Sequence, residues 1–227
     1  MGNMGSESFR GLEGKLWSKV LETLDKLFES GVYSPTNFAM SLGLDRKLRG
    51  IVYNLARGRV LDVGCGDGYY SLPLLENAQE VVCVDPLARK GSESDPRLHV
   101  VKAIAEYLPL RSKSVEFSTA MFSFRDFLDK PRGLSEMKRA SRIGVFIVEI
   151  FNPSTWFRPF LYAYVLFIAP LLAFLVSRGK GKGWRLLYPT IRIMPRASLF
   201  ERMGGKVLVS KGFGSLAIVY LPVNPRG

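Results

Sequence analysis

The sequence contains little histidine and little cysteine. Its 227 residues include one histidine and two cysteines, Cys65 and Cys83, which lie eighteen positions apart and form no CxxC pair. Zinc sites gather several Cys and His ligands at short spacing, and disulfide-stabilised domains carry several cysteine pairs. We therefore expect neither a metal site nor a disulfide framework. A reducing cytosol fits this composition.

Acidic side chains are also scarce, and the N-terminus lacks an apolar stretch. The chain has 20 Asp and Glu against 32 Lys and Arg, a formal net charge of +12. This balance favours an anionic partner such as a nucleic acid or a phospholipid surface, but it does not choose between them. The first eleven residues lack the apolar core of a signal peptide, so we expect a chain that is not exported.

Short apolar runs alternate with helical segments through the middle of the chain. Five runs are rich in β-branched residues: 59–63, 80–85, 97–101, 115–121 and 145–150. Such runs are typical of parallel strands covered by helices on both faces. Two more runs, 206–210 and 214–221, flank a turn with Gly212 and predict an antiparallel hairpin. The predicted fold class is α/β, a doubly wound seven-stranded Rossmann-like sheet, mostly parallel with an antiparallel C-terminal hairpin.

The most informative stretch is VLDVGCGDGYYSL, residues 60–72, which predicts a strand, a glycine turn and a helix from about Tyr69. Glycines let a backbone approach a ligand closely, and a helix N-terminus offers unpaired N–H groups. Asp85 ends the next strand, where a carboxylate can accept both ribose hydroxyls of a nucleoside. Asp62 either fixes the turn or meets an ammonium group. The pattern predicts a nucleoside-binding site.

These residues resemble the class I S-adenosylmethionine-dependent methyltransferases, whose first motif and ribose-binding acid look like VLDVGCGDG and VCVDP. The resemblance implies S-adenosyl-L-methionine as the cofactor. Residues 103–110 look like the segment that cups adenine, although Ile104 stands where an acid is common, and Glu106 has the alternative of facing solvent. The implied cofactor-binding residues are Asp62, Gly64, Cys65, Gly66, Gly68, Asp85, Pro86, Ala105 and Glu106.

Three further stretches resemble the ubiquinone and menaquinone biosynthesis C-methyltransferases. They are 33–50, 121–140 and 148–203, and Arg125 occupies the place of that family's active-site arginine. The resemblance implies methyl transfer to a ring carbon of a polyprenyl quinol or demethylmenaquinol. The exact acceptor stays open, because the chain departs from the family pattern at Ser34, Thr36, Asp45 and Asp126.

Carbon methylation of a phenolic ring requires loss of a hydroxyl proton and benefits from a fixed cation beside the oxygen. Arg125 is the expected cation, with a surface or helix-capping role as its alternative. Asp126 and Tyr33 are the candidate proton acceptors, directly or through water. The expected substrate-binding residues are Asn37, Phe124, Tyr188 and Arg192. Phe124 has a packing role as its alternative, and Tyr188 and Arg192 have the alternative of orienting the insertion.

An uncharged run of eighteen residues, 159–176, is the other conspicuous feature. As a helix it is about 27 Å long, barely a membrane span, and Pro159 and Pro170 interrupt or cap it. Basic residues flank both ends, which favours a helix lying on an anionic membrane or lining a pocket over a span or an ordinary core helix. We therefore expect a cytoplasmic protein peripherally associated with the membrane.

The chain shows no linker or repeat, so we expect one domain over residues 1–227. Its expected parts are a helical lid (1–57), a cofactor-binding core (58–150), an apolar helical insertion (151–195), and a C-terminal helix and hairpin (196–227). Within the lid we expect one helix over 12–28 and a second helical stretch after the segment 31–37, to about Arg57.

Three rival functions remain at the level of sequence. One is methylation of a different membrane lipid or small molecule, and another is a non-catalytic cofactor-binding membrane adaptor. A nucleic-acid substrate is disfavoured, since the basic residues cluster beside apolar rather than stacking aromatic segments. The sequence leaves a homodimer open.

Overall fold

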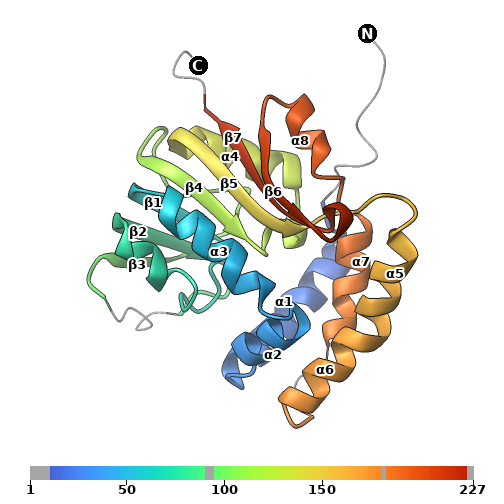
Figure 1. Cartoon of the computed structure of the whole chain (residues 1–227). Helices are drawn as coiled ribbons and strands as arrows, with labels where there is room; N and C mark the ends of the chain where they lie inside the picture. The colour runs from blue at the N-terminus through green and yellow to red at the C-terminus, as the bar shows by residue number, and fades with distance from the viewer. Residues whose placement is uncertain (1–10, 90–94, 180–182, 224–227) are drawn as a thin grey trace.

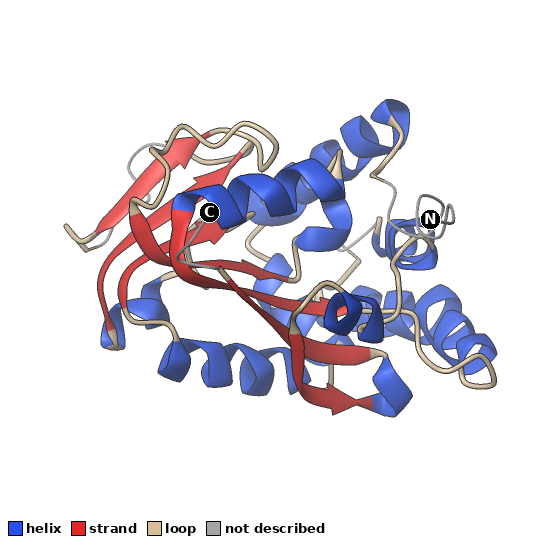
Figure 2. Ribbon diagram, turned by 90° about the horizontal axis from the view of Figure 1, so that it is seen from above, coloured by secondary structure: helices blue, strands red, loops and turns tan. Residues whose placement is uncertain are grey.

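A single seven-stranded sheet organises the chain, and helices cover both of its faces (Figures 1 and 2). The computed structural model describes residues 11–89, 95–179 and 183–223. The strand order is β3-β2-β1-β4-β5-β7-β6, in which β7 is antiparallel to both of its neighbours and the other pairs are parallel. The strands are β1 Gly58–Val63, β2 Ala78–Asp85, β3 Leu98–Lys102, β4 Val115–Met121, β5 Ser141–Ile150, β6 Lys206–Lys211 and β7 Leu216–Pro222. The predicted fold class and hairpin are confirmed.

A hydrophobic core lies on each face of the sheet, because neighbouring residues of a strand point to opposite faces. On β1, Leu61 and Val63 face the core beneath α4 (Lys130–Ala140), whereas Val60 faces the core beneath α3 (Leu44–Leu55). The helices cover the two faces of the sheet, so the carboxyl ends of its parallel strands are available for a ligand site.

The N-terminal part contains three helices, α1 (Gly14–Glu29), α2 (Tyr33–Met40) and α3. The helix expected over 12–28 is present as α1. The expectation of one stretch beginning after the segment 31–37 was wrong, because α2 starts inside that segment. Gly43, with φ of +74°, separates α2 from α3, since this left-handed conformation cannot continue a helix.

The helix expected from about Tyr69 is largely absent. After the glycine turn the chain forms turns and then one short 3₁₀ helix, η1 (Leu72–Glu76), with Pro73 in its first turn. Proline fits a first helical turn but supplies no N–H group. The turn itself, rather than a long helix, therefore presents the backbone to a ligand.

The insertion folds as one helical run in three parts: α5 (Arg158–Ala163), a π-helical turn η3 (Tyr164–Ile168) and α6 (Ala169–Val176). Pro159 lies in its first turn, as expected for a cap. Pro170 does not end the helix, because the backbone widens to the π-turn just before this residue. The remaining elements are η2 Phe124–Asp126, η4 Trp184–Leu186, α7 Leu187–Arg192, α8 Ser198–Arg202 and η5 Gly212–Gly214.

Candidate functional site

The glycine turn after β1 can be built only with glycine at its key positions. Gly64, Gly66 and Gly68 have φ of +74°, +64° and +81°, which other residues rarely adopt. A Cβ on Gly64 would lie 2.3 Å from Cβ of Ser123, and one on Gly66 would lie 2.7 Å from Cζ of Phe28. The turn is therefore enclosed by the end of β4 and by α1.

A disulfide joins Cys65 in this turn to Cys83 on β2. The expectation that no disulfide forms was wrong, because the parallel pairing of β1 with β2 brings the two positions together. Cys65 thus contributes to the site by holding the turn rather than by a free thiol. Persistent disulfides are typical of oxidising compartments and of intracellular proteins of hyperthermophiles.

Asp85 is connected to the glycine turn through the backbone. Its carboxylate accepts hydrogen bonds from Gly66 N–H at 2.8 Å and from Leu87 N–H at 2.7 Å. Burial raises the pKa of Asp85, and the two hydrogen bonds oppose this shift. The acid at the end of β2 is therefore held at a fixed position beside the turn, as a ribose-binding acid requires.

Asp62 fixes the turn from beneath. Its two carboxylate oxygens accept hydrogen bonds from the hydroxyls of Ser71 and Thr119, each at 2.7 Å, and the side chain is buried. Burial raises the pKa of this carboxyl, opposed by the same hydroxyls. Of its two sequence-level alternatives, this geometry favours the structural one over contact with an ammonium group.

A small cleft of about 70 Å³ lies between α1 and the carboxyl ends of β1, β2 and β4. Its lining includes five of the expected cofactor-binding residues: Gly64, Asp85, Pro86, Ala105 and Glu106. Glu106 is buried and its Oε1 accepts the backbone N–H of Asp129 at 2.8 Å, so the solvent-facing alternative was wrong. The tight glycine turn and the fixed acid fit an adenosyl group, but the volume does not, because α1 covers the cleft.

Arg125 and Asp126 lie in η2, directly after β4. Arg125 Nη1 donates to Glu149 Oε1 at 2.7 Å, and Arg125 Nη2 lies 3.7 Å from Asp126 Oδ2. Burial lowers the pKa of Arg125, but the charges of Glu149 and Asp126 outweigh it and raise that pKa. The surface alternative for Arg125 was wrong, since the residue is buried within an ionic cluster.

The two candidate proton acceptors, Asp126 and Tyr33, differ in their pKa values. Burial raises the pKa of Asp126 to about 6, against the opposing charge of Arg125. Desolvation raises the pKa of Tyr33 to about 12, so the tyrosine stays protonated and can donate a hydrogen bond but not accept a proton. Tyr33 packs against Trp184 with ring centroids 5.7 Å apart and lines the cofactor cleft with Asp126.

Sequence reasoning missed two members of this ionic cluster. Glu149 lies within the apolar strand β5 and is 0% exposed. Lys130, the first residue of α4, is also 0% exposed, and its Nζ has no hydrogen-bond partner among the described residues. Burial lowers the pKa of Lys130 to about 8, while the charge of Asp126 opposes that shift. The sequence offered one sign of this cluster, a charged residue inside an apolar strand, and that sign marks Glu149 but not Lys130.

An apolar groove of about 390 Å³ lies on the other side of η2, between α2 and the helical insertion. Its walls are aliphatic and aromatic side chains of α2, α5, η3 and α6, with Asn37 and Arg125 among the few polar ones. Phe122 lines both this groove and the cofactor cleft, and its φ of +62° is unusual for a bulky residue. Sequence reasoning missed Phe122, which no motif distinguishes.

Three expected substrate-binding residues lie elsewhere. Phe124 is fully buried in the hydrophobic core, where it packs against Phe127 and Phe200, so its packing alternative is the one realised. Tyr188 and Arg192 line a separate cavity beside α7. Only Asn37 of that set lines the apolar groove.

The helical run Arg158–Val176 is long and apolar enough to cross a membrane, and it alone passes this test among residues 11–89, 95–179 and 183–223. Only 17% of an 18-residue window is buried, so the alternative of an ordinary core helix was wrong. One side packs on α2 through Ala169 and Ala173. The other exposes large apolar side chains: Phe160, Phe167, Ile168, Leu171, Phe174, Leu175 and Val176.

Comparisons with known proteins identify the family of the chain. A family model described as a methyltransferase domain matches residues 61–148. A demethylmenaquinone methyltransferase of Streptomyces avermitilis is 30% identical over 207 residues, covering 80% of this chain and 89% of the relative. A ubiquinone/menaquinone biosynthesis C-methyltransferase UbiE of Geobacter sp. is 25% identical over 190 residues, covering 75% and 80%.

Among solved structures, the cyclase SpnF matches with a TM-score of 0.51 and 14% identity over 82% of each chain, which shows the fold alone. The sequence relatives carry the assignment further. The protein is an S-adenosylmethionine-dependent methyltransferase, with S-adenosyl-L-methionine as its cofactor. The chain belongs to the ubiquinone and menaquinone biosynthesis C-methyltransferase family of class I methyltransferases.

Proposed function

We propose that this methyltransferase methylates a ring carbon of a prenylated quinol, such as a demethylmenaquinol, at the cytoplasmic surface of an anionic membrane. The observation that carries the proposal is the position of Phe122, which lines both the cofactor cleft and the apolar groove. A side chain shared by a nucleoside site and an apolar site would bring a methyl donor close to an apolar acceptor. The relatives' names point to the same class of acceptor.

The cofactor half of the site would be held by the glycine turn and by Asp85. Backbone at Gly64 and Gly66 can approach a ligand closely, while the Asp85 carboxylate is fixed for ribose hydroxyls. The bound cofactor supplies an electrophilic methyl group on a sulfonium. Ala105 and Glu106 would enclose the adenine together with Ile104, all of which line the cleft.

The acceptor half would use the apolar groove for the isoprenoid tail. The groove opens beside α2 and the insertion, and its polar residues Asn37 and Arg125 are those that can orient a ring hydroxyl. Asn37 Nδ2 already donates to Asp45 Oδ2 at 3.3 Å, which fixes the amide. An apolar pocket with a few fixed polar groups is the usual design of a small-molecule site.

Asp126 would accept the proton of the ring hydroxyl as the carbon attacks the methyl group. A carboxyl with a pKa of about 6 is mostly ionised at neutral pH and is a stronger base than an ordinary aspartate. Arg125 would stabilise the oxyanion, although its charge is shared with Glu149. The ring carbon would take up the methyl group as the bond from that methyl to the sulfonium sulfur breaks and leaves a neutral thioether. The proton on the methylated ring carbon would then pass to water, and the ring oxygen would take back a proton from Asp126, which restores the aromatic quinol.

The exposed apolar face of Arg158–Val176 supports action at a membrane. Large aromatic and aliphatic side chains there are exposed, and the basic residues Arg178 and Arg185 follow the helix. An apolar face with cationic neighbours is typical of a helix that lies on an anionic membrane. The groove opens along the same helical run, so a tail could pass directly from lipid to protein.

The test is methyl transfer from labelled S-adenosylmethionine to extracted membrane lipids, with the product identified by mass. Wild type is compared with Asp126→Asn and Asp85→Ala, and Asp95→Asn, an exposed carboxylate paired with Arg97, is the control. The proposal is supported if wild type and the Asp95→Asn control label a quinone, and if Asp126→Asn and Asp85→Ala do not. Label on another lipid keeps the enzyme and refutes the quinol, and cofactor binding without any label refutes the acceptor class.

A further inference from the structure

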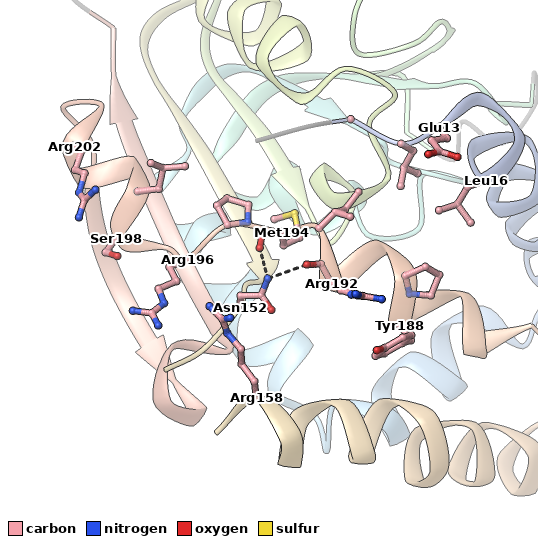
Figure 3. Close-up of a pocket in the computed structure, with 16 residues that line it drawn as sticks. Glu13, Leu16, Asn152, Arg158, Tyr188, Arg192, Met194, Arg196, Ser198 and Arg202 are labelled. Atoms are coloured by element: carbon pink, nitrogen blue, oxygen red, sulfur yellow. Dashed lines mark hydrogen bonds between the residues drawn. The ribbon is translucent and has the colours of Figure 1, made fainter. Parts of the chain in front are cut away.

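A cavity of about 930 Å³ lies apart from the cofactor cleft and the apolar groove and shares no lining residue with either. It is bounded by the start of α1, the start of α5, α7 and α8 (Figure 3). Methyl transfer as proposed above makes no use of this cavity.

The lining of this cavity is strongly cationic. It contains four arginines, Arg158, Arg192, Arg196 and Arg202, and a single acid, Glu13. In Figure 3, Arg158, Arg196 and Arg202 lie on one side of Asn152, and Glu13 lies on the opposite side. Four like charges around one cavity repel each other, so such a cluster is favourable only where an anion or water compensates it.

These arginines have few partners of their own. None of the four has an ion pair within the described ranges, and Glu13 lies outside ion-pair distance of each. Arg158 Nε is a buried donor without a hydrogen-bond partner in the described part of the chain. Arg196 Nη2 donates to Thr155 Oγ1 at 2.6 Å, the one side-chain hydrogen bond of this arginine among the described residues. A buried cationic donor without an acceptor is costly, and a bound anion at this position would supply the acceptor that Arg158 Nε lacks.

The backbone around the arginines is held in place by Asn152. Its Nδ2 donates to the carbonyl oxygens of Arg192, at 3.2 Å, and Met194, and its Oδ1 accepts from Tyr162 Oη at 2.8 Å. This single buried amide ties the end of α7 to α5, the two elements that carry Arg192 and Arg158. The cationic groups are therefore presented by a fixed frame, as a binding site requires.

We propose that this cavity binds the phosphate group of an anionic ligand. Planar guanidinium groups pair with two oxygens at once, and phosphate offers enough charge and oxygens for several arginines, whereas a single carboxylate does not. The phosphate belongs either to a lipid headgroup or to a soluble phosphate compound. Arg158 is also the first residue of the exposed apolar helical run, so a headgroup bound here would anchor that helix on a lipid surface.

The test compares two double variants of equal net charge. Arg192→Gln with Arg202→Gln removes two exposed arginines of the cavity, and Arg57→Gln with Arg111→Gln removes two exposed arginines that do not line it. Binding of sodium pyrophosphate is measured by titration calorimetry at fixed ionic strength. Flotation is measured with vesicles of phosphatidylcholine alone and of phosphatidylcholine mixed with phosphatidylglycerol.

We expect the cavity variant to bind at least about tenfold more weakly than wild type, while the control variant keeps wild-type binding. Loss of pyrophosphate binding assigns a soluble phosphate ligand. Loss of the phosphatidylglycerol dependence of flotation, without pyrophosphate binding by wild type, assigns a lipid headgroup. Equal behaviour of the two double variants in both arms overturns the proposal.

Discussion

Arg125 and Glu149 form a buried ion pair, with Nη1 donating to Oε1 at 2.7 Å and side-chain exposures of 5% and 0%. The Glu149 Oε2 atom also accepts the backbone N–H of Arg125 at 3.1 Å. Glu149 therefore holds both the charge and the backbone of the residue beside the acceptor groove. The family-like segment 121–140, which contains Arg125, does not by itself reveal this dependence on a residue of β5.

Replacing Glu149 by Gln should lower the free energy of unfolding by about 3 kcal/mol, because buried Arg125 then loses its closer countercharge and keeps only the Asp126 carboxylate, 3.7 Å away. Denaturant unfolding measures the change. Glu116→Gln is the matched control, since Glu116 pairs with Arg142 near the surface and its loss should cost about 1 kcal/mol or less. Equal losses in the two variants would show that the Arg125–Glu149 pair contributes no more than a surface pair.

The methyl-transfer rate should depend on the ionisation of Asp126. Its pKa of about 6 predicts that kcat/KM rises with pH through about 6 and then levels, because only the ionised carboxylate accepts a proton. Asp126→Asn should abolish this rise and lower the rate at pH 8 by about a hundredfold or more. A pH profile unchanged by the substitution would assign the proton to another group.

The same carboxyl makes stability fall as pH rises. The folded pKa of about 6 lies above the ordinary value of 3.8, so the folded state binds the proton more tightly. The stabilising contribution is complete below about pH 4 and is lost as pH rises through about 6. The free energy of unfolding of Asp126→Asn, taken relative to wild type, should therefore be about 2 kcal/mol higher at pH 8 than at pH 4. Urea unfolding at the two pH values checks the sign.

The positions of the strands were predictable because they depend on the local sequence. Buried parallel strands need continuous apolar runs, and 115–121 matches β4 residue for residue. The disulfide was not predictable, since it depends on the register between β1 and β2, which places Asp62 opposite Cys83. Register arises from packing of the whole sheet.

The site was predictable only where a motif fixes the backbone. The glycine turn and Asp85 were found because close approach and ribose binding demand those residue types at that spacing. Phe122 and Lys130 were missed, because a left-handed φ and a buried ammonium follow from tertiary contacts. Tyr188 and Arg192 were predicted to bind substrate together with Asn37 because they resemble family residues. In the folded chain they line a separate cavity, whereas Asn37 lines the apolar groove.

Helix α1 should move when the cofactor binds, because its Phe28 ring lies over the glycine turn and leaves only about 70 Å³ in the cleft. Gly66→Ala should push this ring outward, accelerating hydrogen exchange across α1 and weakening cofactor binding. Gly204→Ala is a close control, since Gly204 also has a positive φ of +82° but a Cβ there would meet nothing within 4 Å. Equal exchange in α1 of both variants would argue against the contact.

Removing the disulfide should cost stability and cofactor affinity together. Crosslinking two residues 18 positions apart restricts the unfolded chain, which corresponds to about 3 kcal/mol. Cys65→Ala with Cys83→Ala should lose this amount and weaken binding of S-adenosylmethionine, because the glycine turn is no longer fixed beside Asp85. Reductant should reproduce both effects in wild type and change nothing in the double variant. A reductant effect on the double variant would locate the sensitivity elsewhere.

The exposed face of the apolar helical run should drive membrane binding. Phe167 and Leu171 are 72% and 56% exposed, so Phe167→Ser with Leu171→Ser should leave the fold intact and reduce partition into anionic vesicles by more than about tenfold. Ile51→Ser with Leu55→Ser on α3 is the control, because these side chains are also exposed but lie on another element. If both double variants lose partition equally, general hydrophobicity rather than this helix binds the membrane. If neither loses it, the helix does not meet the lipid, and the groove must receive its acceptor from solution.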